Sequence, residues 1–298
     1  MAIDPKHVAN AAQARMLYLD NLRPVEASAD WTYAKFMARK VVIEALRDSD
    51  RLRNIEGALL KSGVHMLVFR HMLAPPMSQD QFKLVCRSWS KGSEDRDAPL
   101  RKEAAAAVAE AVYQRFDRSL MALAKGDWRD IEGLLRVTST LIAGQKVATA
   151  RRSRLASEQE YAVVELLKGA GWTILPSKLI DTRAAVPPMH FMRKTRFATA
   201  TTAHQEVDIA CGMKNSYVLA MECKVTNDET NSVKRVNDVL KKATAWEKHW
   251  GSFVMTAALL QGVVAAKDVQ RLDDAGVRVF WSHRLKDFRA WLTTQMAV

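Results

Sequence analysis

Three charged residues near the middle of the chain have types and spacings that allow them to converge. Asp208 lies within a short apolar run, and Glu222 and Lys224 follow a second apolar run after a polar turn. Strand side chains alternate between two faces, so Glu222 and Lys224 point to the same face. If the two runs pair, Asp208 can face them from the neighbouring strand. The sequence therefore predicts an Asp, a Glu and a Lys at one edge of a sheet.

The two apolar runs are predicted to form a β-hairpin. They cover residues 207–211 and 217–221, and the polar residues 212–216 lie between them. Gly212 and Asn215 in this turn can take a positive φ angle, which tight turns often require.

Two carboxylates on adjacent strands can share a hard divalent cation, because Mg²⁺ prefers oxygen ligands and keeps several waters. Asp208 and Glu222 would each supply one oxygen, and the backbone carbonyl of Cys223 a third. A cation held there activates water and polarises a phosphodiester. Lys224 would contact the attacking water and the scissile phosphate. These are the residue types that phosphodiester hydrolysis requires.

A Glu-x-Lys pair alone is common. The alternative interpretation is a solvated ion pair on an edge strand, with Asp208 in a turn. The formal net charge of +12 favours the catalytic interpretation. Such an excess of positive charge attracts a polyanion, and nucleic acid is the leading candidate.

The composition favours a globular protein without structural disulfides or zinc. Hydrophobic residues make up 48% of the 298 residues, so the chain can bury a core. Its three cysteines (Cys86, Cys211 and Cys223) form no CxxC pair, which argues against a disulfide framework and a zinc site and favours a reducing, cytoplasmic setting. The first residues lack the apolar stretch of a signal peptide, and no long apolar run predicts a membrane span.

The first half of the chain reads almost wholly as helix. Predicted helices cover residues 5–20, 28–48, 54–73, 79–87, 100–116, 128–141 and 144–169. Ser78 and Gln81 match a capping box, and a polar loop is predicted at 88–97. We expect an all-helical domain at residues 1–145.

The second half alternates between strands and helices. Strands are predicted at 173–175, 252–256 and 277–281 besides the hairpin, and helices at 228–250, 267–275 and from 284 onward. The basic segment 176–205 is predicted to be a long loop. This order predicts an α/β domain with a mixed sheet at residues 146–298. The predicted fold class of the whole chain is α+β, with an all-helical domain followed by this α/β domain.

Val207-Asp208 followed by Glu222-Cys223-Lys224 resembles the signature of the PD-(D/E)xK nucleases, with valine in place of proline. More broadly, the chain resembles the XamI-type restriction endonucleases. The similarity lies at residues 73–81, 207–209, 222–224 and 230–235, and more weakly at 281–284.

The resemblance implies a PD-(D/E)xK nuclease core with an α/β/α arrangement and a helical domain for DNA recognition or dimerisation. It implies Mg²⁺-dependent cleavage of double-stranded DNA at a short, usually palindromic site, with Mn²⁺ expected to substitute. Asp208 and Glu222 would bind the metal, and Lys224 would be the catalytic lysine. A palindromic target implies a homodimer, and a restriction system implies a cognate DNA methyltransferase.

Other residues are candidates for supporting roles. Glu160 and Glu165 lie on the helix before the first strand, where related nucleases often place an acid, and Glu160 is the possible accessory acid. For either residue an exposed helix carboxylate is the alternative. With Glu222 in place, a second acid on the following helix, such as Asp228 or Asp238, is not needed. The candidate DNA contacts are Asn231, Lys234 and Arg235 after the hairpin, Arg193, Lys194 and Arg196 in the basic segment, and Ser90 and Lys91 in the helical half. For each basic residue a solvated surface position is the alternative.

Two other functions fit the same residues. One is a repair or structure-specific nuclease on the same fold. The other is a DNA-binding regulator whose α/β half is not catalytic, which the presence of all three residues (Asp208, Glu222 and Lys224) argues against.

Overall fold

The protein is described by a computed structural model that covers residues 3–21, 24–201 and 203–297. It divides into two compact units, Pro24–Ala150 and a second unit formed by Met1–Arg23 with Arg151–Val298. This division differs from the predicted boundary after residue 145. Helix α1 (Pro5–Asp20) contacts β6 and α11 of the second unit because its Ala11 and Ala14 are buried in the apolar core there.

Within the described residues, seven strands of the second unit form one mixed sheet in the order β1-β3-β4-β5-β6-β7, with β2 paired to β3. The strands are β1 (Thr173–Leu175), β2 (Leu179–Ile180), β3 (His190–Phe197), β4 (Gln205–Gly212), β5 (Val218–Thr226), β6 (Val254–Gly262) and β7 (Arg278–Trp281). The β3-β4 and β4-β5 pairs are antiparallel, and the other pairs are parallel. The predicted mixed sheet is confirmed.

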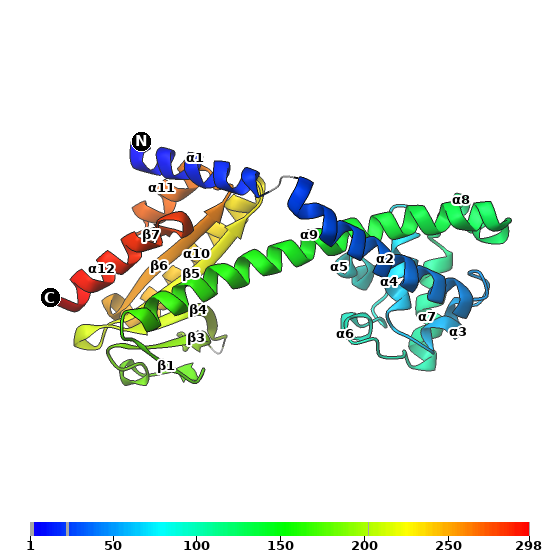
Figure 1. Cartoon of the computed structure of the whole chain (residues 1–298). Helices are drawn as coiled ribbons and strands as arrows, with labels where there is room; N and C mark the ends of the chain where they lie inside the picture. Colours follow the sequence, from blue (N-terminus) through cyan, green and yellow to red (C-terminus); the bar gives the residue numbers. More distant parts are fainter. Residues whose placement is uncertain (1–2, 22–23, 202, 298) are drawn as a thin grey trace. The chain divides into compact units, whose positions relative to one another are not determined.

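Helices cover both faces of this sheet (Figure 1). Besides α1, they are α9 (Trp128–Gly169), α10 (Glu229–Trp250), α11 (Ala266–Asp274) and α12 (Leu285–Ala297). On one face, Leu167 of α9 and Phe288 of α12 share a core with Met221 of β5. On the other face, Val239 of α10 shares a core with Ala258 of β6. Alternate residues of each central strand are therefore buried under different helices.

The predicted hairpin is confirmed. Strands β4 and β5 pair with Ile209 opposite Met221 and Cys211 opposite Leu219. The turn is a short 3-10 segment in which Asn215 has a φ of 55° and Ser216 a φ of 60°. Asparagine tolerates this left-handed conformation better than most residues, which explains its place in the turn.

The prediction of a long loop at 176–205 was wrong. Strands β2 and β3 lie within it, and β3 is paired on both sides, with β4 on one edge and β1 and β2 on the other. Phe191, Thr195 and Phe197 of β3 are buried, whereas Arg193 and Arg196 are exposed. Phe191 and Phe197 hold the strand in the core, while Arg193 and Arg196 remain exposed.

The Pro24–Ala150 unit consists of helices joined by short turns. They are α2 (Pro24–Asp48), α3 (Ile55–Leu59), α4 (His65–His71), α5 (Gln79–Val85), α6 (Lys91–Asp95), α7 (Lys102–Tyr113), α8 (Arg118–Lys125) and the first part of α9. The predicted capping box of α5 is confirmed, with Ser78 accepting a hydrogen bond from the Gln81 backbone. In the described part of the chain, no helix is both long and apolar enough to cross a membrane.

Three predictions in this half were wrong. The helix expected at 54–73 is interrupted near Gly63, whose added Cβ would lie 2.3 Å from the Ser93 carbonyl oxygen, so this backbone contact requires glycine. The loop expected at 88–97 contains α6, and Trp89 there is fully buried beside Phe82. The two helices expected at 128–141 and 144–169 are one continuous helix, α9, which Gly144 does not break.

Candidate active site

Asp208, Glu222 and Lys224 lie together where β4 and β5 separate. The Lys224 ammonium is 2.6 Å from Glu222 Oε2 and 3.9 Å from Asp208 Oδ2. The three side chains thus converge as the strand alternation predicts, and Glu222 and Lys224 share one face of β5.

The separation of the strands positions Asp208. The last paired residues are Ile209 and Met221, and the next residues along each strand are Asp208 and Glu222. Here the Asp208 carboxylate takes the place of a main-chain partner, since its Oδ2 accepts a hydrogen bond of 2.8 Å from the Cys223 N–H. Beyond this point β5 keeps its pairing with β6. Asp208 and Glu222 thus lie at the point where the pairing of β4 with β5 ends.

Three candidates from elsewhere in the chain join these residues: Glu160, Arg193 and Lys194. Lys194 lies opposite Asp208, between the paired residues Arg193↔Ile209 and Thr195↔Val207, and its ammonium is 2.7 Å from Asp208 Oδ1. The same ammonium is 2.5 Å from Glu160 Oε1, and Arg193 binds Glu160 Oε2 at 3.1 Å. Glu160 is therefore a buried acid of the cluster rather than a solvated helix carboxylate.

Helix α10 adds two residues that the sequence analysis did not assign. Lys242 Nζ lies 2.8 Å from Glu222 Oε2. Asp238 Oδ2 lies 3.2 Å from Lys224 Nζ, so this helix also brings an acid to the site. The two are spaced i, i+4 and share one face of the helix. Lys234 and Lys241 lie at similar spacings from Asp238, so this spacing alone does not single out Lys242.

The pKa values of the two acids of the hairpin are shifted in opposite directions. Glu222 is 0% exposed, and its Oε1 has no hydrogen-bond partner among the described residues. Burial raises the pKa of Glu222 despite its lysine neighbours. Burial also acts to raise the pKa of Asp208, but the hydrogen bond from Lys194 and the charge of Lys224 outweigh it, so this pKa is lowered. Asp208 is thus ionised more readily than Glu222.

Lys224 is held in its charged form. Burial acts to lower its pKa, yet the carboxylates of Glu222 and Asp208 outweigh burial and raise it. An ammonium with a raised pKa is a poor proton acceptor at neutral pH. It is better suited to stabilise negative charge beside it.

The donor atoms suit a hard divalent cation. Carboxylate oxygens of Asp208 and Glu222 lie where the pairing of β4 with β5 ends, and the unpartnered Oε1 of Glu222 is a buried acceptor that lacks a donor. The part of the chain that the structure describes holds no cluster of three or more His, Cys, Asp or Glu side chains arranged around a metal. A cation here would therefore rest on two carboxylates, a backbone carbonyl and water.

The candidate DNA contacts differ in their surroundings. Asn231 is engaged by Asp228, the N-cap of α10, which accepts the Asn231 N–H at 2.7 Å. Lys91 is paired with Asp80, and Ser90 is the N-cap residue of α6. Lys234, Arg235 and Arg196 are exposed. Arg193 and Lys194 form ion pairs with Glu160, so they are not free side chains of a loop.

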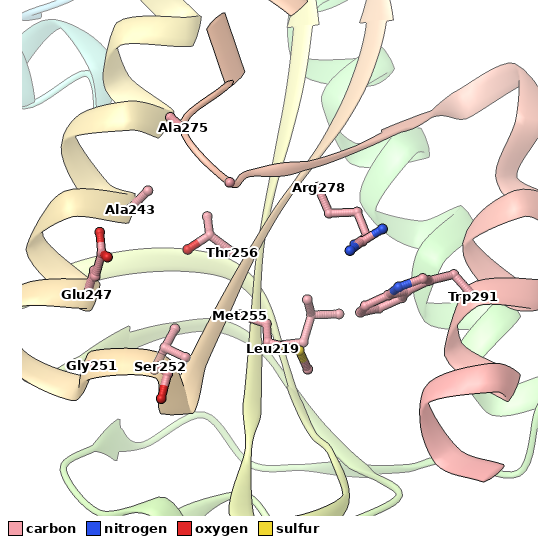
Figure 2. Close-up of a pocket in the computed structure, with 12 residues that line it drawn as sticks. Leu219, Ala243, Glu247, Gly251, Ser252, Met255, Thr256, Ala275, Arg278 and Trp291 are labelled. Carbon is pink, nitrogen blue, oxygen red and sulfur yellow. The ribbon is translucent and has the colours of Figure 1, made fainter. Parts of the chain in front are cut away.

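A separate pocket of about 280 Å³ lies toward the opposite ends of β5 and β6 (Figure 2). Leu219, Thr256 and Glu247 line it, and Arg278 lies over the Trp291 ring at 5.4 Å. None of the residues of the acid cluster lines this pocket. The chemistry of the described site is confined to the edge where β4 and β5 separate.

A family described as XamI restriction endonuclease matches residues 50–281, a range that includes Asp208, Glu222 and Lys224. The Type II restriction enzyme XamI of Xanthomonas campestris pv. amaranthicola is 27% identical over 187 residues, covering 61% of this chain and 66% of that protein. The crystal structure of protein VC1899 from Vibrio cholerae is 12% identical and covers 89% of this chain and 56% of that one, with a TM-score of 0.32, too low to support an argument.

Proposed function

This chain belongs to the XamI restriction endonuclease family, and on that premise we propose that it is a Mg²⁺-dependent type II restriction endonuclease. It would hydrolyse phosphodiester bonds of double-stranded DNA at a short specific site. The observation that carries the proposal is the convergence of Asp208, Glu222 and Lys224 where β4 and β5 separate. Membership of the family indicates DNA as the substrate. The three residues are of the types that metal-assisted phosphodiester hydrolysis requires.

In this proposal Asp208, Glu222 and the Cys223 carbonyl hold the cation, with Mn²⁺ able to replace Mg²⁺. When bound, the metal supplies a Lewis acid for the scissile phosphate and lowers the pKa of a bound water. The Cys223 N–H fixes the orientation of Asp208 through its hydrogen bond. Burial keeps water away from Glu222, which strengthens its interaction with any positive charge placed beside it.

Lys224 acts as an electrostatic partner of the reacting phosphate. Its raised pKa keeps it charged at neutral pH. A fixed positive charge beside the phosphate stabilises the negative charge that develops in the transition state. Glu160 serves as the accessory acid by holding Arg193 and Lys194 beside Asp208.

The two units have different roles in this proposal. The unit formed by residues 1–23 and 151–298 is a PD-(D/E)xK nuclease core, and Pro24–Ala150 recognises DNA or mediates dimerisation. A palindromic target requires a twofold-symmetric homodimer. A cognate DNA methyltransferase belongs to the same system, and the buried, unpaired cysteines fit a reducing cytoplasm.

DNA contacts are proposed on both units. Lys234 and Arg235 on α10 and Arg196 on β3 are exposed and positively charged, as phosphate contacts require. Asn231 lies in the first turn of the same helix, and Ser90 and Lys91 are the candidates of the helical unit.

Incubation of the purified chain with a mixed-sequence plasmid and Mg²⁺ tests the proposal. Discrete fragments on a gel are the expected result. A smear or a nicked circle indicates the alternative of a repair or structure-specific nuclease. Intact DNA under all conditions contradicts a catalytic role and leaves a DNA-binding regulator.

A further inference from the structure

The acid cluster is balanced by positive side chains of the same chain. Its carboxylates are Glu160, Asp208, Glu222 and Asp238, and its cations are Arg193, Lys194, Lys224 and Lys242. The formal charges of this set cancel. A site proposed to receive a divalent cation is therefore already neutralised, and the added ion has to compete with ammonium groups.

The competition is sharpest at Glu222. Both Lys224, at 2.6 Å, and Lys242, at 2.8 Å, contact its Oε2, while its Oε1 has no partner among the described residues. Two ammonium groups on one oxygen repel each other, and a divalent cation at the same carboxylate adds to that repulsion. One of the two lysines must leave when the cation arrives.

Lys242 is the lysine that can leave. Lys224 also contacts Asp238 and lies near Asp208, so it keeps carboxylate partners without Glu222. The one carboxylate within ion-pairing distance of Lys242, among the described residues, is Glu222. The Lys242 side chain is itself 15% exposed, so its long stem already reaches the solvent.

We propose that Lys242 is a displaceable counter-cation of Glu222. It neutralises the buried carboxylate in the metal-free protein, and it leaves for a DNA phosphate when a divalent cation binds. This inference rests on the proposed function, because it takes Glu222 to be a metal ligand. Lys242 is a positioning residue that acts through Glu222.

The exchange links metal binding to DNA binding. In the absence of DNA, the released Lys242 ammonium is solvated by water alone. When DNA is present, a phosphate gives this ammonium a new anionic partner. DNA therefore raises metal affinity, and metal raises DNA affinity by the same factor, because binding free energies are reciprocal. The metal site stays weak until the substrate is present.

Mn²⁺ binding to the full-length, DNA-free protein tests the inference without any measurement of activity. Free Mn²⁺ is counted by electron paramagnetic resonance during a titration. Lys242→Met keeps the apolar stem but removes the charge, and we expect it to bind Mn²⁺ about tenfold more tightly, the equivalent of one lost charge-assisted hydrogen bond. Lys241→Met makes the same change in net charge at the exposed neighbouring position and should match the wild type.

Lys242→Arg is a control variant that keeps the positive charge and shows whether a substitution at this position disturbs the fold. It should bind Mn²⁺ no more tightly than the wild type, and the rise in melting temperature on adding Mn²⁺ should be largest for Lys242→Met. An affinity of Lys242→Met equal to or weaker than that of the wild type overturns the inference. Glu222→Gln separates the two proposals, because Mn²⁺ binding that survives this change contradicts the proposed metal site itself.

Discussion

At the scale of single residues, the surroundings of Glu222 determine how the site responds to pH. The carboxylate is fully buried and burial raises its pKa, whereas the pKa of a free glutamate is about 4.3. Only the ionised form binds a cation. The site should therefore lose metal at a higher pH than an exposed glutamate would.

The resulting prediction concerns the acid limb of the cleavage rate. As pH falls through the raised pKa of Glu222, the carboxylate is protonated and cleavage declines. A higher Mg²⁺ concentration should move this limb to lower pH, because the cation binds the ionised form and competes with the proton. Rates measured against pH at two Mg²⁺ concentrations check this. If the acid limb of the pH profile stays at the same pH at both Mg²⁺ concentrations, Glu222 does not bind the metal.

The sequence was sufficient to find Asp208, Glu222 and Lys224, because the two-residue period of a strand places Glu222 and Lys224 on one face. It was not sufficient to find Lys242. Helix α10 carries several lysines of the same type, and only the packing of that helix on β5 shows which of them reaches Glu222. Contacts between distant segments of this kind are not visible in a local pattern.

At the scale of elements, the junction between β5 and β6 beside the site depends on glycine. Gly262 has a φ of 92°, and a Cβ added there would lie 2.0 Å from the Thr226 carbonyl oxygen. Gly276 also has a positive φ, of 74°, but a Cβ there would meet no atom within 4 Å. The two glycines separate the effect of backbone strain from that of a steric clash.

Gly262→Ala is therefore expected to destabilise the protein more than Gly276→Ala does. Backbone strain alone costs about 1–3 kcal/mol, and the contact with Thr226 adds to it at Gly262. Denaturant unfolding of both variants measures the difference. Equal losses of stability would show that the strand end moves freely to accept a side chain.

The errors in element prediction also have physical causes. Strand β3 was read as a loop because basic residues, Arg193, Lys194 and Arg196, interrupt its apolar pattern. Two of these have carboxylate partners in the acid cluster, which the sequence alone could not supply. The sequence predicts a break in helix α9 at Gly144 because glycine weakens helices. The helix instead continues through Gly144. A Cβ added there would meet only the Trp31 ring at 4.0 Å, so no close backbone contact requires glycine at this position.

At the scale of the whole molecule, the net charge of +12 should dominate DNA affinity. Each phosphate neutralised by a lysine or arginine releases counterions, so the logarithm of the binding constant falls linearly with the logarithm of salt concentration. We expect a steep decline for specific and non-specific DNA alike.

Lys234→Ala should reduce this salt slope by about one unit, the contribution of a single phosphate contact. Lys168→Ala is the matched control, because Lys168 is paired with Glu165 and is not a proposed contact. Binding constants determined over a series of salt concentrations give both slopes. A slope for Lys234→Ala equal to that of the control would exclude Lys234 from the DNA interface.

The arrangement of the chain into units was only partly visible in the sequence. The change from helices to alternating strands after Trp172 identified the α/β half. The placement of α1 in that same unit was not predicted, because Ala11 and Ala14 are too small to mark a buried face in a helix of mixed composition. Its contacts with β6 and α11 appear only in the folded chain.

The most direct test of the central claim is plasmid cleavage by Lys224→Ala in Mg²⁺, with DNA binding measured in parallel. The claim is that Asp208, Glu222 and Lys224 form one hydrolytic centre. It predicts a loss of cleavage of at least about a hundredfold, while the variant retains DNA binding. Cleavage by Lys224→Ala at the rate of the wild-type protein would contradict the claim.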